Sequence, residues 1–553
     1  MRYIIVGGVA AGASFACRLR RLDEFAEIII YEKTNFVSYA NCGLPYYISS
    51  VIDDKSKLTL QTPASLKARF NIDVYVSHEV IFIEKEEKRI KVKNLINGEE
   101  FYDNYDRLIL APGSEAIKLT KNSRRMHELK TVEDSIKIKD IINKLNVKKA
   151  TIIGGGFIGL EIAENLVHAG IKVTLIEGKS HVLANLDSEM ASFIHHELRK
   201  NGVKLLLNKM VKKVNEDDDK VIIKLENETI VSDLLIQAIG VKPNSALAKN
   251  ANLDLDIRGT IKINENYKTS DDNIYALGDV IALDSLIDNS RVSIPLAGFA
   301  NREGRELASY FLLNKKNDIK ALGTSILKLF NLSAASTGFN EEQLINKKIP
   351  YEKIYLCPTN HASYYPGSSI LNIKVLFNKT DYKILGAQIV GEEGVDKRID
   401  VLAMAIKGNM KVYDLANAEL SYAPPFGSAK DPINMIGFIA ENLKNGLVDQ
   451  FYFEEIETLQ KDSNNLFIDV RSENEYKEGH IPNFINIPLD ELRDKLDLID
   501  KNKNIYLNCQ SALRSYIALR ILVQRGYKCK HLAGGYRIYQ SFFEDQEFIK
   551  NQK

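Results

Sequence analysis

The sequence contains two copies of one local pattern, a short apolar strand, a glycine-rich turn, a helix and a second strand that ends in glutamate. The first copy begins at Tyr3–Val6 and ends at Glu32, and the second begins at Ala150–Ile153 and ends at Glu177. This order is typical of a dinucleotide site, because glycines permit a tight turn and the acid accepts hydrogen bonds from a ribose. Two such units about 145 residues apart predict an α/β chain that holds two dinucleotides.

The two turns differ in how completely they match this pattern. Val9 occupies the position of the expected middle glycine in the first turn, whose glycines are Gly7, Gly8 and Gly12. The second turn has the full set in register: Gly154, Gly156 and Gly159. Glu177 would repel a 2′-phosphate and therefore favours NADH, and the nearby Lys179 softens that preference.

Composition and charge limit the remaining possibilities. The 553 residues suffice for three or four domains, and 74 Lys and Arg balance 73 Asp and Glu. This balance gives no support for a nucleic-acid or membrane-surface role, and no apolar run is long enough to span a membrane. The five cysteines show no CxxC pair and no zinc-ligand spacing, and we find no signal peptide. We therefore expect a reduced, cytoplasmic protein without a metal.

Cys42 lies in the turn-rich segment Val37–Tyr46, directly before a predicted short helix that starts at Leu44. A thiol at a helix N-terminus meets unpaired N–H groups and the positive end of the dipole, and both favour the reactive thiolate. The alternative is a small buried side chain, as for most free cysteines. We interpret the other thiols outside motifs in that way: Cys17, Cys357 and Cys529.

Three more strands end in glycine or Gly-Asp, at Leu108–Gly113, Leu235–Gly240 and Asn273–Asp279. With these segments, residues 1 to about 445 resemble the two-dinucleotide flavoprotein disulfide reductases. In that family the first glycine unit holds FAD and the second holds NAD(P)H. The resemblance implies FAD contacts from Gly7, Gly8, Gly12, Glu32, Lys33, Gly113, Gly278 and Asp279. It implies NAD(P)H contacts from Gly154, Gly156, Gly159, Glu161, Glu177 and Gly240.

The segment around Cys42 lacks the second cysteine of the glutathione reductase type. The single-cysteine branch remains, with coenzyme A-disulfide reductases, persulfide reductases, NADH oxidases and NADH peroxidases. Peroxidase-like members carry a histidine where this sequence has Ala10 and Ala11, which argues against peroxide chemistry. A water-forming NADH oxidase with Cys42 as a sulfenic acid is the alternative enzyme. A redox-regulated binding protein is the alternative without catalysis.

Two tyrosine-bearing segments, 360–367 and 420–431, closely resemble those of coenzyme A-disulfide reductases. In that group two tyrosines of the partner subunit point at the cysteine, and the matching positions are Tyr364 and Tyr422. A tyrosine can hydrogen-bond a departing thiolate and supply its proton. The resemblance also implies a homodimer, and CoA contacts from Ser14, Arg18, Arg21, Ser38, Asn41, Asn301 and Lys430. For Arg18 a solvated helix face is an equal alternative.

A new series of strand-like and helical segments begins after Gly446. Strand-like runs at Leu466–Arg471 and Asn504–Asn508 lead to Cys509, and Arg514 follows in the spacing CxxxxR before a helix. This part closely resembles a single rhodanese domain, in which the backbone N–H groups of such a loop surround an anion, here a persulfide. Arg514 would close the loop with a permanent positive charge. A degenerate module is the alternative, and the retention of both Cys509 and Arg514 speaks against it.

Together these expectations predict the domain organisation and the reaction of the chain. The expected domains are FAD-binding at 1–112 and 243–322, NAD(P)H-binding at 113–242, an α+β dimerisation domain at 323–445 and an α/β rhodanese domain at 446–553. Within them, the pattern predicts a helix from Ser14 to Leu22 and an amphipathic helix from Asp400 to Asn409. The expected reaction is FAD-dependent reduction of CoA disulfide, CoA persulfide or polysulfide by NAD(P)H through a Cys42–S–S–CoA mixed disulfide. Sulfane sulfur would be carried on Cys509, and the pantetheine arm of CoA would move it between the two thiols.

Overall fold

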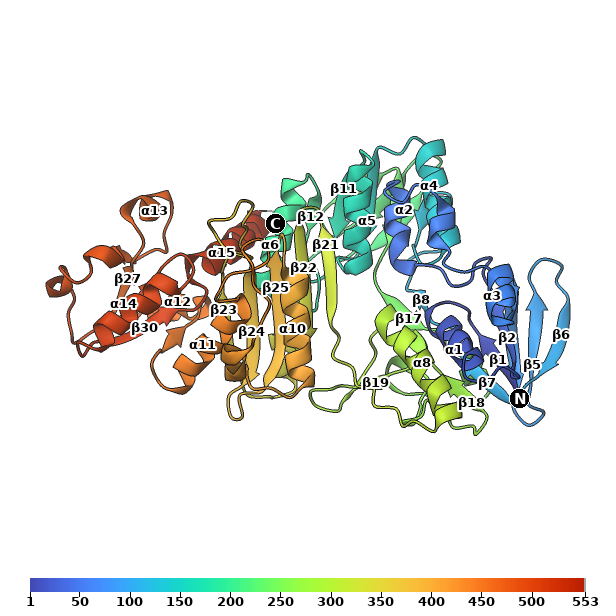
Figure 1. Cartoon of the computed structure of the whole chain (residues 1–553). Helices are drawn as coiled ribbons and strands as arrows, with labels where there is room; N and C mark the ends of the chain where they lie inside the picture. The colour runs from blue at the N-terminus through green and yellow to red at the C-terminus, as the bar shows by residue number, and fades with distance from the viewer. Residues whose placement is uncertain (552–553) are drawn as a thin grey trace. The chain divides into compact units, whose positions relative to one another are not determined.

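The computed structural model describes residues 1–551, and these residues form two compact units (Figure 1). The first unit comprises Met1–Gly178, Gly202–Lys204 and Lys209–Leu322, and the second comprises Lys179–Asn201, Leu205–Asn208 and Gly323–Lys553. Both units combine helices with β-sheets, which confirms the expected α/β class. None of the described helices combines the length and the apolar character needed to cross a membrane.

The first unit contains a five-stranded sheet in the order β18-β7-β1-β2-β3. The strands run in parallel, and helix α1 (Ala10–Arg20) connects β1 to β2. Their side chains are almost completely buried in the centre of the sheet, which explains why they are apolar in unbroken runs. The strand bounds are β1 Arg2–Val6, β2 Glu27–Glu32, β3 Asp73–Val76, β7 Arg107–Leu110 and β18 Ile274–Ala276.

Helix α1 starts earlier than the sequence indicated, at Ala10 rather than Ser14. The alanines before Gly12 are strong helix formers, so the helix begins directly at the glycine turn. Only glycine fits at position 12, because a Cβ there would lie 2.0 Å from the Gly7 carbonyl oxygen. The close contact fixes the helix N-terminus against the end of β1, where a pyrophosphate binds in such folds.

A second sheet of the first unit places four parallel strands in the order β11-β10-β16-β9. Helix α5 (Phe157–His168) connects β10 to β11 and begins at the second glycine turn. The short helix α2 (Leu44–Ile48), which follows Cys42, packs against α5 and α4 (Val132–Lys144). The strand bounds are β9 Met126–His127, β10 Lys149–Ile153, β11 Lys172–Ile176 and β16 Leu234–Gln237.

The second unit is built on an antiparallel sheet in the order β21-β22-β25-β24-β23. Helix α10 (Val395–Lys407) packs on β22 and β25, and it begins five residues before the predicted start at Asp400. Gly394 has φ +75° and therefore sets the start of the helix. The strand bounds are β21 Ser325–Leu329, β22 Leu332–Gly338, β23 Tyr351–Leu356, β24 Asn372–Asn378 and β25 Ile384–Gly391.

The C-terminal part of the second unit has a five-stranded parallel sheet in the order β26-β30-β29-β27-β28. Helix α14 (Leu513–Val523) packs on β29 and β30, and helix α15 (Gly535–Asn551) packs on α6 (Ser188–Lys200). The strand bounds are β26 Gln450–Phe451, β27 Asn465–Asp469, β28 Ile485–Asn486, β29 Asn504–Asn508 and β30 Lys528–Leu532.

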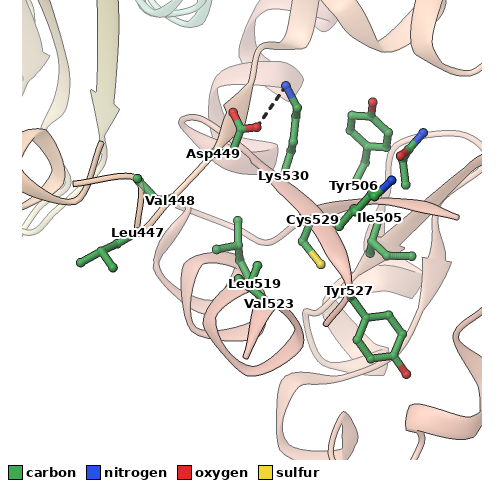
Figure 2. Close-up of a pocket in the computed structure, with 13 residues that line it drawn as sticks. Leu447, Val448, Asp449, Ile505, Tyr506, Leu519, Val523, Tyr527, Cys529 and Lys530 are labelled. Atoms are coloured by element: carbon green, nitrogen blue, oxygen red, sulfur yellow. Dashed lines mark ion pairs between the residues drawn. The ribbon is translucent and has the colours of Figure 1, made fainter. Parts of the chain in front are cut away.

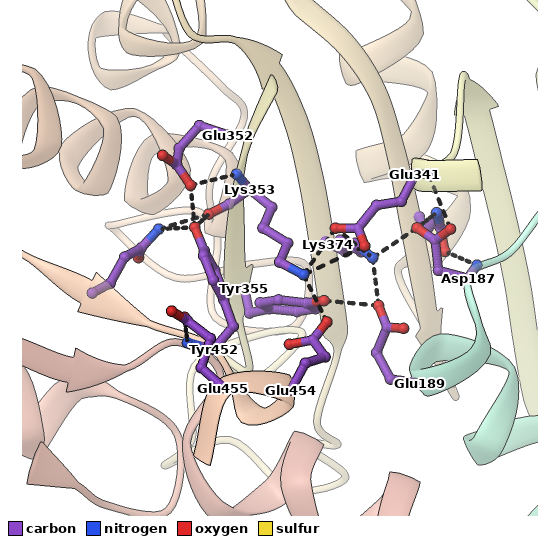
Figure 3. Close-up of polar contacts among 12 residues, drawn as sticks. Asp187, Glu189, Glu341, Glu352, Lys353, Tyr355, Lys374, Tyr452, Glu454 and Glu455 are labelled. Atoms are coloured by element: carbon purple, nitrogen blue, oxygen red, sulfur yellow. Dashed lines mark hydrogen bonds and ion pairs between the residues drawn. The ribbon is translucent and has the colours of Figure 1, made fainter. Parts of the chain in front are cut away.

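A buried ionic cluster joins three segments of the second unit (Figure 3). The Lys374 ammonium is fully buried and lies 2.7 Å from the carboxylate of Asp187 and 2.5 Å from that of Glu189. Lys353 lies 2.8 Å from Glu454, which belongs to the C-terminal part. Buried charges are tolerated only when they are paired, so these two lysines of the antiparallel sheet fix both α6 and the C-terminal part to it.

Candidate active site

The first glycine turn has the shape that a bound dinucleotide requires. Gly7 has φ +97°, and a Cβ there would lie 2.2 Å from a backbone oxygen of the neighbouring strand end. The buried Glu32 carboxylate accepts a hydrogen bond from the Gly8 N–H at 2.9 Å. A side-chain-free turn beside an acidic strand end fits FAD. Of the other residues expected here, Gly113 has φ +67° and Lys33 is exposed.

Asp279 lies in a polar group that the sequence did not reveal. Ser114 Oγ donates to Asp279 Oδ2 at 2.7 Å, and Lys130 Nζ donates to Ser114 Oγ at 3.0 Å. Glu303 accepts from the Gly278 N–H at 2.6 Å, and burial raises the pKa of Glu303 to about 7. The turn that is expected to face the ribityl and phosphate part of FAD is thus held by residues from three distant segments.

The second glycine turn is equally suited to a nicotinamide dinucleotide. Gly154 has φ +109°, and a Cβ at Gly159 would lie 2.0 Å from the Gly154 oxygen. No atom lies within 4 Å of the Cβ position of Gly156, so open space faces this part of the turn. Glu177 Oε2 accepts from the Gly155 N–H at 2.7 Å. The geometry leaves room for a pyrophosphate at the start of α5.

Cys42 is exposed and lies in a short 3-10 turn, Asn41–Gly43, before α2. Partial desolvation raises the pKa of this thiol, the carboxylate of Glu161 raises it further, and Lys130 lowers it. The expected preference for the thiolate is therefore opposed, because the following helix is only five residues long and an acid lies nearby. Burial, and then Glu164, raise the pKa of Glu161 itself to about 7.

Helices α1 and α8 (Ala297–Leu313) pack against each other in the first unit and bring polar side chains of both helices together, here called the α1–α8 polar patch. Ser14 Oγ donates to Asn301 Oδ1 at 2.5 Å, and Arg18 Nε donates to Ser309 Oγ at 3.4 Å. Asn301 and Ser309 are two helical turns apart on α8, so Arg305, one turn from each, lies on the same face. The structure thus places Arg305, which the sequence did not single out, beside two of the predicted CoA residues.

Three arginines of the α1–α8 polar patch have no acidic partner among the described residues. No carboxylate within the described residues lies within 4.0 Å of the guanidinium groups of Arg18, Arg21 or Arg305. Desolvation, then Arg305 and then Arg21 lower the pKa of Arg18, as expected for neighbouring like charges. Arg20 differs, because it is buried and donates to the backbone oxygens of surrounding loops. The three arginines of the α1–α8 polar patch are suited to an anion, whereas Arg20 is structural.

The other residues predicted to contact CoA lie in separate places. Ser38 has φ +48°, and its N–H donates to the Gly8 oxygen at 2.8 Å, so it lies beside the first glycine turn. Asn41 is half-buried next to Cys42. Lys430 is exposed in the second unit, within the second tyrosine segment.

The second unit brings the two predicted tyrosines together. The hydroxyls of Tyr364 and Tyr422 lie 3.2 Å apart, and the two residues are 74% and 49% exposed. Their hydrogen bond raises the pKa of Tyr364. The buried Arg398 connects the two segments, because its Nη2 donates to the Asn360 oxygen at 2.8 Å and to Asp431 Oδ2 at 2.8 Å. No local sequence pattern distinguishes Arg398 as an anchor.

The C-terminal loop holds Cys509 between β29 and α14, where the residue is only 1% exposed. Arg514 makes a two-pronged contact with Glu475, with distances of 2.7 and 2.6 Å to the two carboxylate oxygens. The hydrogen bond from Arg514 lowers the pKa of Glu475 to about 2. The sequence placed Arg514 at the loop but did not reveal that its charge is already paired.

A pocket of about 450 Å³ lies elsewhere in the C-terminal part, around Leu519, Val523 and Tyr527 (Figure 2). None of the residues predicted for the site lines it, and the cysteine that does is Cys529. Burial raises the pKa of Cys529 to about 12, so this thiol is unreactive.

Comparisons with known families cover most of the chain. A family described as pyridine nucleotide-disulphide oxidoreductase matches residues 1–304, and the dimerisation domain of the same family matches residues 324–431. A rhodanese-like domain matches residues 453–541.

Individual relatives agree with these matches. A coenzyme A disulfide reductase of Staphylococcus epidermidis is 38% identical over 442 residues, which cover 80% of this chain and 100% of that protein. The crystal structure of reduced Bacillus anthracis CoADR-RHD has a TM-score of 0.96 at 45% identity and covers 98% of both chains. A NAD-dependent persulfide reductase from A. fulgidus has a TM-score of 0.91 at 34% identity, over 98% of this chain and 100% of that one.

These findings define a flavoprotein oxidoreductase that carries a C-terminal rhodanese-like domain. The chain belongs to the pyridine nucleotide-disulphide oxidoreductase family, on its coenzyme A disulfide reductase branch. The family, the fold class and the enzyme class expected from the sequence are thereby confirmed. Membership implies FAD and NAD(P)H as cofactors, and the two glycine turns fit them. The four domain boundaries and the roles of single residues remain predictions.

Proposed function

We propose that the chain is a cytoplasmic homodimeric enzyme that uses NAD(P)H to reduce CoA disulfide, CoA persulfide or polysulfide. The observation that carries the proposal is the combination of one free, exposed thiol, Cys42, with three arginines of the α1–α8 polar patch that have no carboxylate partner among the described residues of the same unit. A reductase with a single thiol needs a second thiol from its substrate. A cluster of arginines suits a substrate with phosphate groups, which CoA has.

The residues of the chain have distinct roles in this reaction. The Cys42 thiolate attacks a CoA disulfide, so that Cys42–S–S–CoA forms and one CoA thiolate leaves. The hydroxyls of Tyr422 and Tyr364, contributed by the partner subunit, donate to the leaving sulfur and supply its proton. FAD, held at the first glycine turn, would supply the two electrons from NAD(P)H, and with one proton from solvent these would reduce the mixed disulfide. The net change is one CoA disulfide reduced to two CoA thiols per NAD(P)H.

The C-terminal domain would carry sulfane sulfur on Cys509 as a persulfide. In a loop that joins a strand to a helix, as between β29 and α14, successive backbone N–H groups can surround an anion. The pantetheine arm of CoA would then move sulfur between Cys509 and Cys42. The Cys509→Ser variant tests this relay, because persulfide and polysulfide turnover should fall while CoA disulfide reduction continues. Unchanged polysulfide turnover would show that the relay is wrong.

Mass spectrometry of the purified, unreduced protein tests the central proposal. We expect one CoA attached to Cys42 and additional sulfur on Cys509, and the Cys42→Ser variant should lack the CoA. NADH oxidation should require CoA disulfide, persulfide or polysulfide. Rapid NADH-dependent oxygen consumption without any sulfur substrate, with Cys42 found as a sulfenic acid, would instead support the water-forming oxidase. Negligible turnover with every substrate would support a binding protein.

A further inference from the structure

The Cys509 thiol is the first member of a buried chain of three side chains. Its Sγ donates to Ser515 Oγ at 3.4 Å, and Ser515 Oγ lies 3.4 Å from His531 Nδ1. Cys509, Ser515 and His531 are 1%, 0% and 7% exposed. Ser515 and His531 belong to α14 and β30, so the fold of the domain brings this chain together.

Besides the ring nitrogen of His531, the Ser515 hydroxyl has two possible acceptors, the Ala512 oxygen and the sulfur of Cys509. In the thiol form it donates to the Ala512 oxygen at 3.0 Å and accepts from Cys509. A hydroxyl rotates freely about its C–O bond, so the same proton can instead point at a sulfur anion. Burial lowers the pKa of His531 to about 4, so the imidazole is neutral near pH 7 and stays beside Ser515 without adding charge.

The charged groups around Cys509 are already paired with one another. Both terminal nitrogens of Arg514 contact Glu475, and Arg471 contacts Asp469 at 2.8 Å. The neighbouring acid–base pairs therefore provide little net positive charge to a sulfur anion. A buried anion is costly unless donors face it, so a neutral hydroxyl next to the sulfur adds to the backbone N–H groups expected from the loop.

We propose that Ser515 donates a hydrogen bond to the Cys509 thiolate when sulfane sulfur leaves, and that His531 positions the Ser515 hydroxyl. The proposal rests on the role of Cys509 as a sulfur carrier. An acceptor anion attacks the outer sulfur of Cys509–S–S⁻ and forms a new bond to it. The bond between the outer sulfur and Sγ breaks, and its electron pair stays on Sγ. The Ser515 proton turns from the Ala512 oxygen to Sγ, and no proton is transferred.

The test uses the full-length holoenzyme in a Cys42→Ser background, with thiosulfate to load the persulfide and cyanide to remove its outer sulfur. We expect Ser515→Ala to slow the cyanide step about tenfold at pH 7, since a donor to a developing anion is lost. Methyl methanethiosulfonate, which is small, neutral and reacts with thiolates, should trap Cys509 about tenfold more slowly at pH 7 but equally fast at pH 10.

Two further variants separate positioning from a general loss of structure. His531→Gln keeps a polar group beside the hydroxyl and should retain most of the cyanide rate, whereas His531→Leu should lose severalfold. Ser541→Ala is the matched control, because it removes a buried hydroxyl that pairs with Ser192 Oγ at 2.6 Å in another part of the second unit. It should leave both rates unchanged.

Two outcomes would overturn the inference. Equal rates for Ser515→Ala and the Cys42→Ser parent at every pH would exclude a role for the hydroxyl. Slower trapping of Cys509 by methyl methanethiosulfonate, by one constant factor from pH 6 to pH 10, would indicate a structural defect instead. Failure of the proposed function looks different: no persulfide would accumulate on Cys509 in the parent protein, while thiolate trapping would still report on Ser515.

Discussion

The arginines of the α1–α8 polar patch show why only part of a positively charged site can be predicted from a sequence. Arg18 lies in α1 and Arg21 is its C-cap residue, and both were predicted from the resemblance to coenzyme A-disulfide reductases. Arg305 lies 287 positions beyond Arg18, and only the packing of the two helices places it there. The three positive charges together suit a ligand with more than one phosphate group, such as the 3′-phosphorylated ADP part of CoA.

Replacing Arg305 tests this site. We expect Arg305→Gln to raise KM for CoA disulfide about tenfold with little change in kcat, because one charge-assisted contact contributes about 1.5 kcal/mol. Steady-state kinetics measure the effect. Arg302→Gln is the matched control on the same helix, since its guanidinium stacks on Phe299 at 4.7 Å. An equal change in KM for both variants would exclude a specific role for Arg305.

The charge on the Glu161 carboxylate is expected to make the reactivity of the Cys42 thiol depend on pH. Glu161 has a pKa of about 7, so it is charged above pH 7, where it raises the pKa of the thiol. Glu161→Gln removes that charge, so Cys42 should react about threefold faster with iodoacetamide at pH 8. Below pH 6 the wild-type carboxyl is protonated and the two proteins should react equally. A rate difference of the same size at pH 5.5 would contradict this explanation.

At the scale of elements, two glycines of the second glycine turn are expected to have different roles, Gly159 in packing and Gly156 in cofactor binding. A Cβ at position 159 would meet a backbone oxygen at 2.0 Å, whereas a Cβ at position 156 would point into open space. We expect Gly159→Ala to lower Tm by several degrees, and Gly156→Ala to leave Tm unchanged while raising KM for NADH about tenfold. Thermal unfolding and kinetics on the same samples measure both. An unchanged KM for Gly156→Ala would indicate that no cofactor approaches this turn.

The contact between α6 and α15 is expected to make the stability of the protein fall at acidic pH. His195 is fully buried, its Nδ1 lies 2.8 Å from Asp545 Oδ2, and burial lowers its pKa. The unfolded chain binds a proton near pH 6.5 that the folded chain does not, so this residue costs stability as pH falls below 6.5. His195→Gln should therefore flatten the decline of Tm between pH 7 and 5. His196→Gln, on the same helix, should keep the wild-type slope.

The elements themselves were largely predictable from the sequence, and their partners were not. Both strand–turn–helix–strand units, the short helix after Cys42 and the loop before Arg514 follow from local patterns of glycine and apolar residues. Local patterns placed the starts of α1 and α10 too late, because the decisive contacts, Gly12 against Gly7 and the turn at Gly394, are made in three dimensions. The anchors Arg398 and Glu303 are polar residues inside helices, and no spacing distinguishes them from solvent-facing ones.

At the scale of the whole molecule, the ionic cluster of the second unit connects its parts. Lys374 is fully buried and contacts both Asp187, which caps the start of α6, and Glu189 in the first turn of α6. Lys374→Met leaves both acids without their cation, and we expect a loss of about 3–5 kcal/mol in the unfolding free energy of this unit. Denaturant unfolding followed by tyrosine fluorescence measures it. Adding Glu189→Gln to Lys374→Met should recover part of the loss, and a further loss would contradict this account.

The packing of α15 on α6 also has a consequence for how the polypeptide is made. The His195 and Asp545 side chains meet across 350 positions of the chain. A ribosome adds about 5–20 residues per second, so α6 emerges on the order of half a minute before its partner helix. During that interval the nascent chain carries an α6 whose inner face is uncovered. We therefore expect newly synthesised molecules to depend on chaperones until α15 arrives.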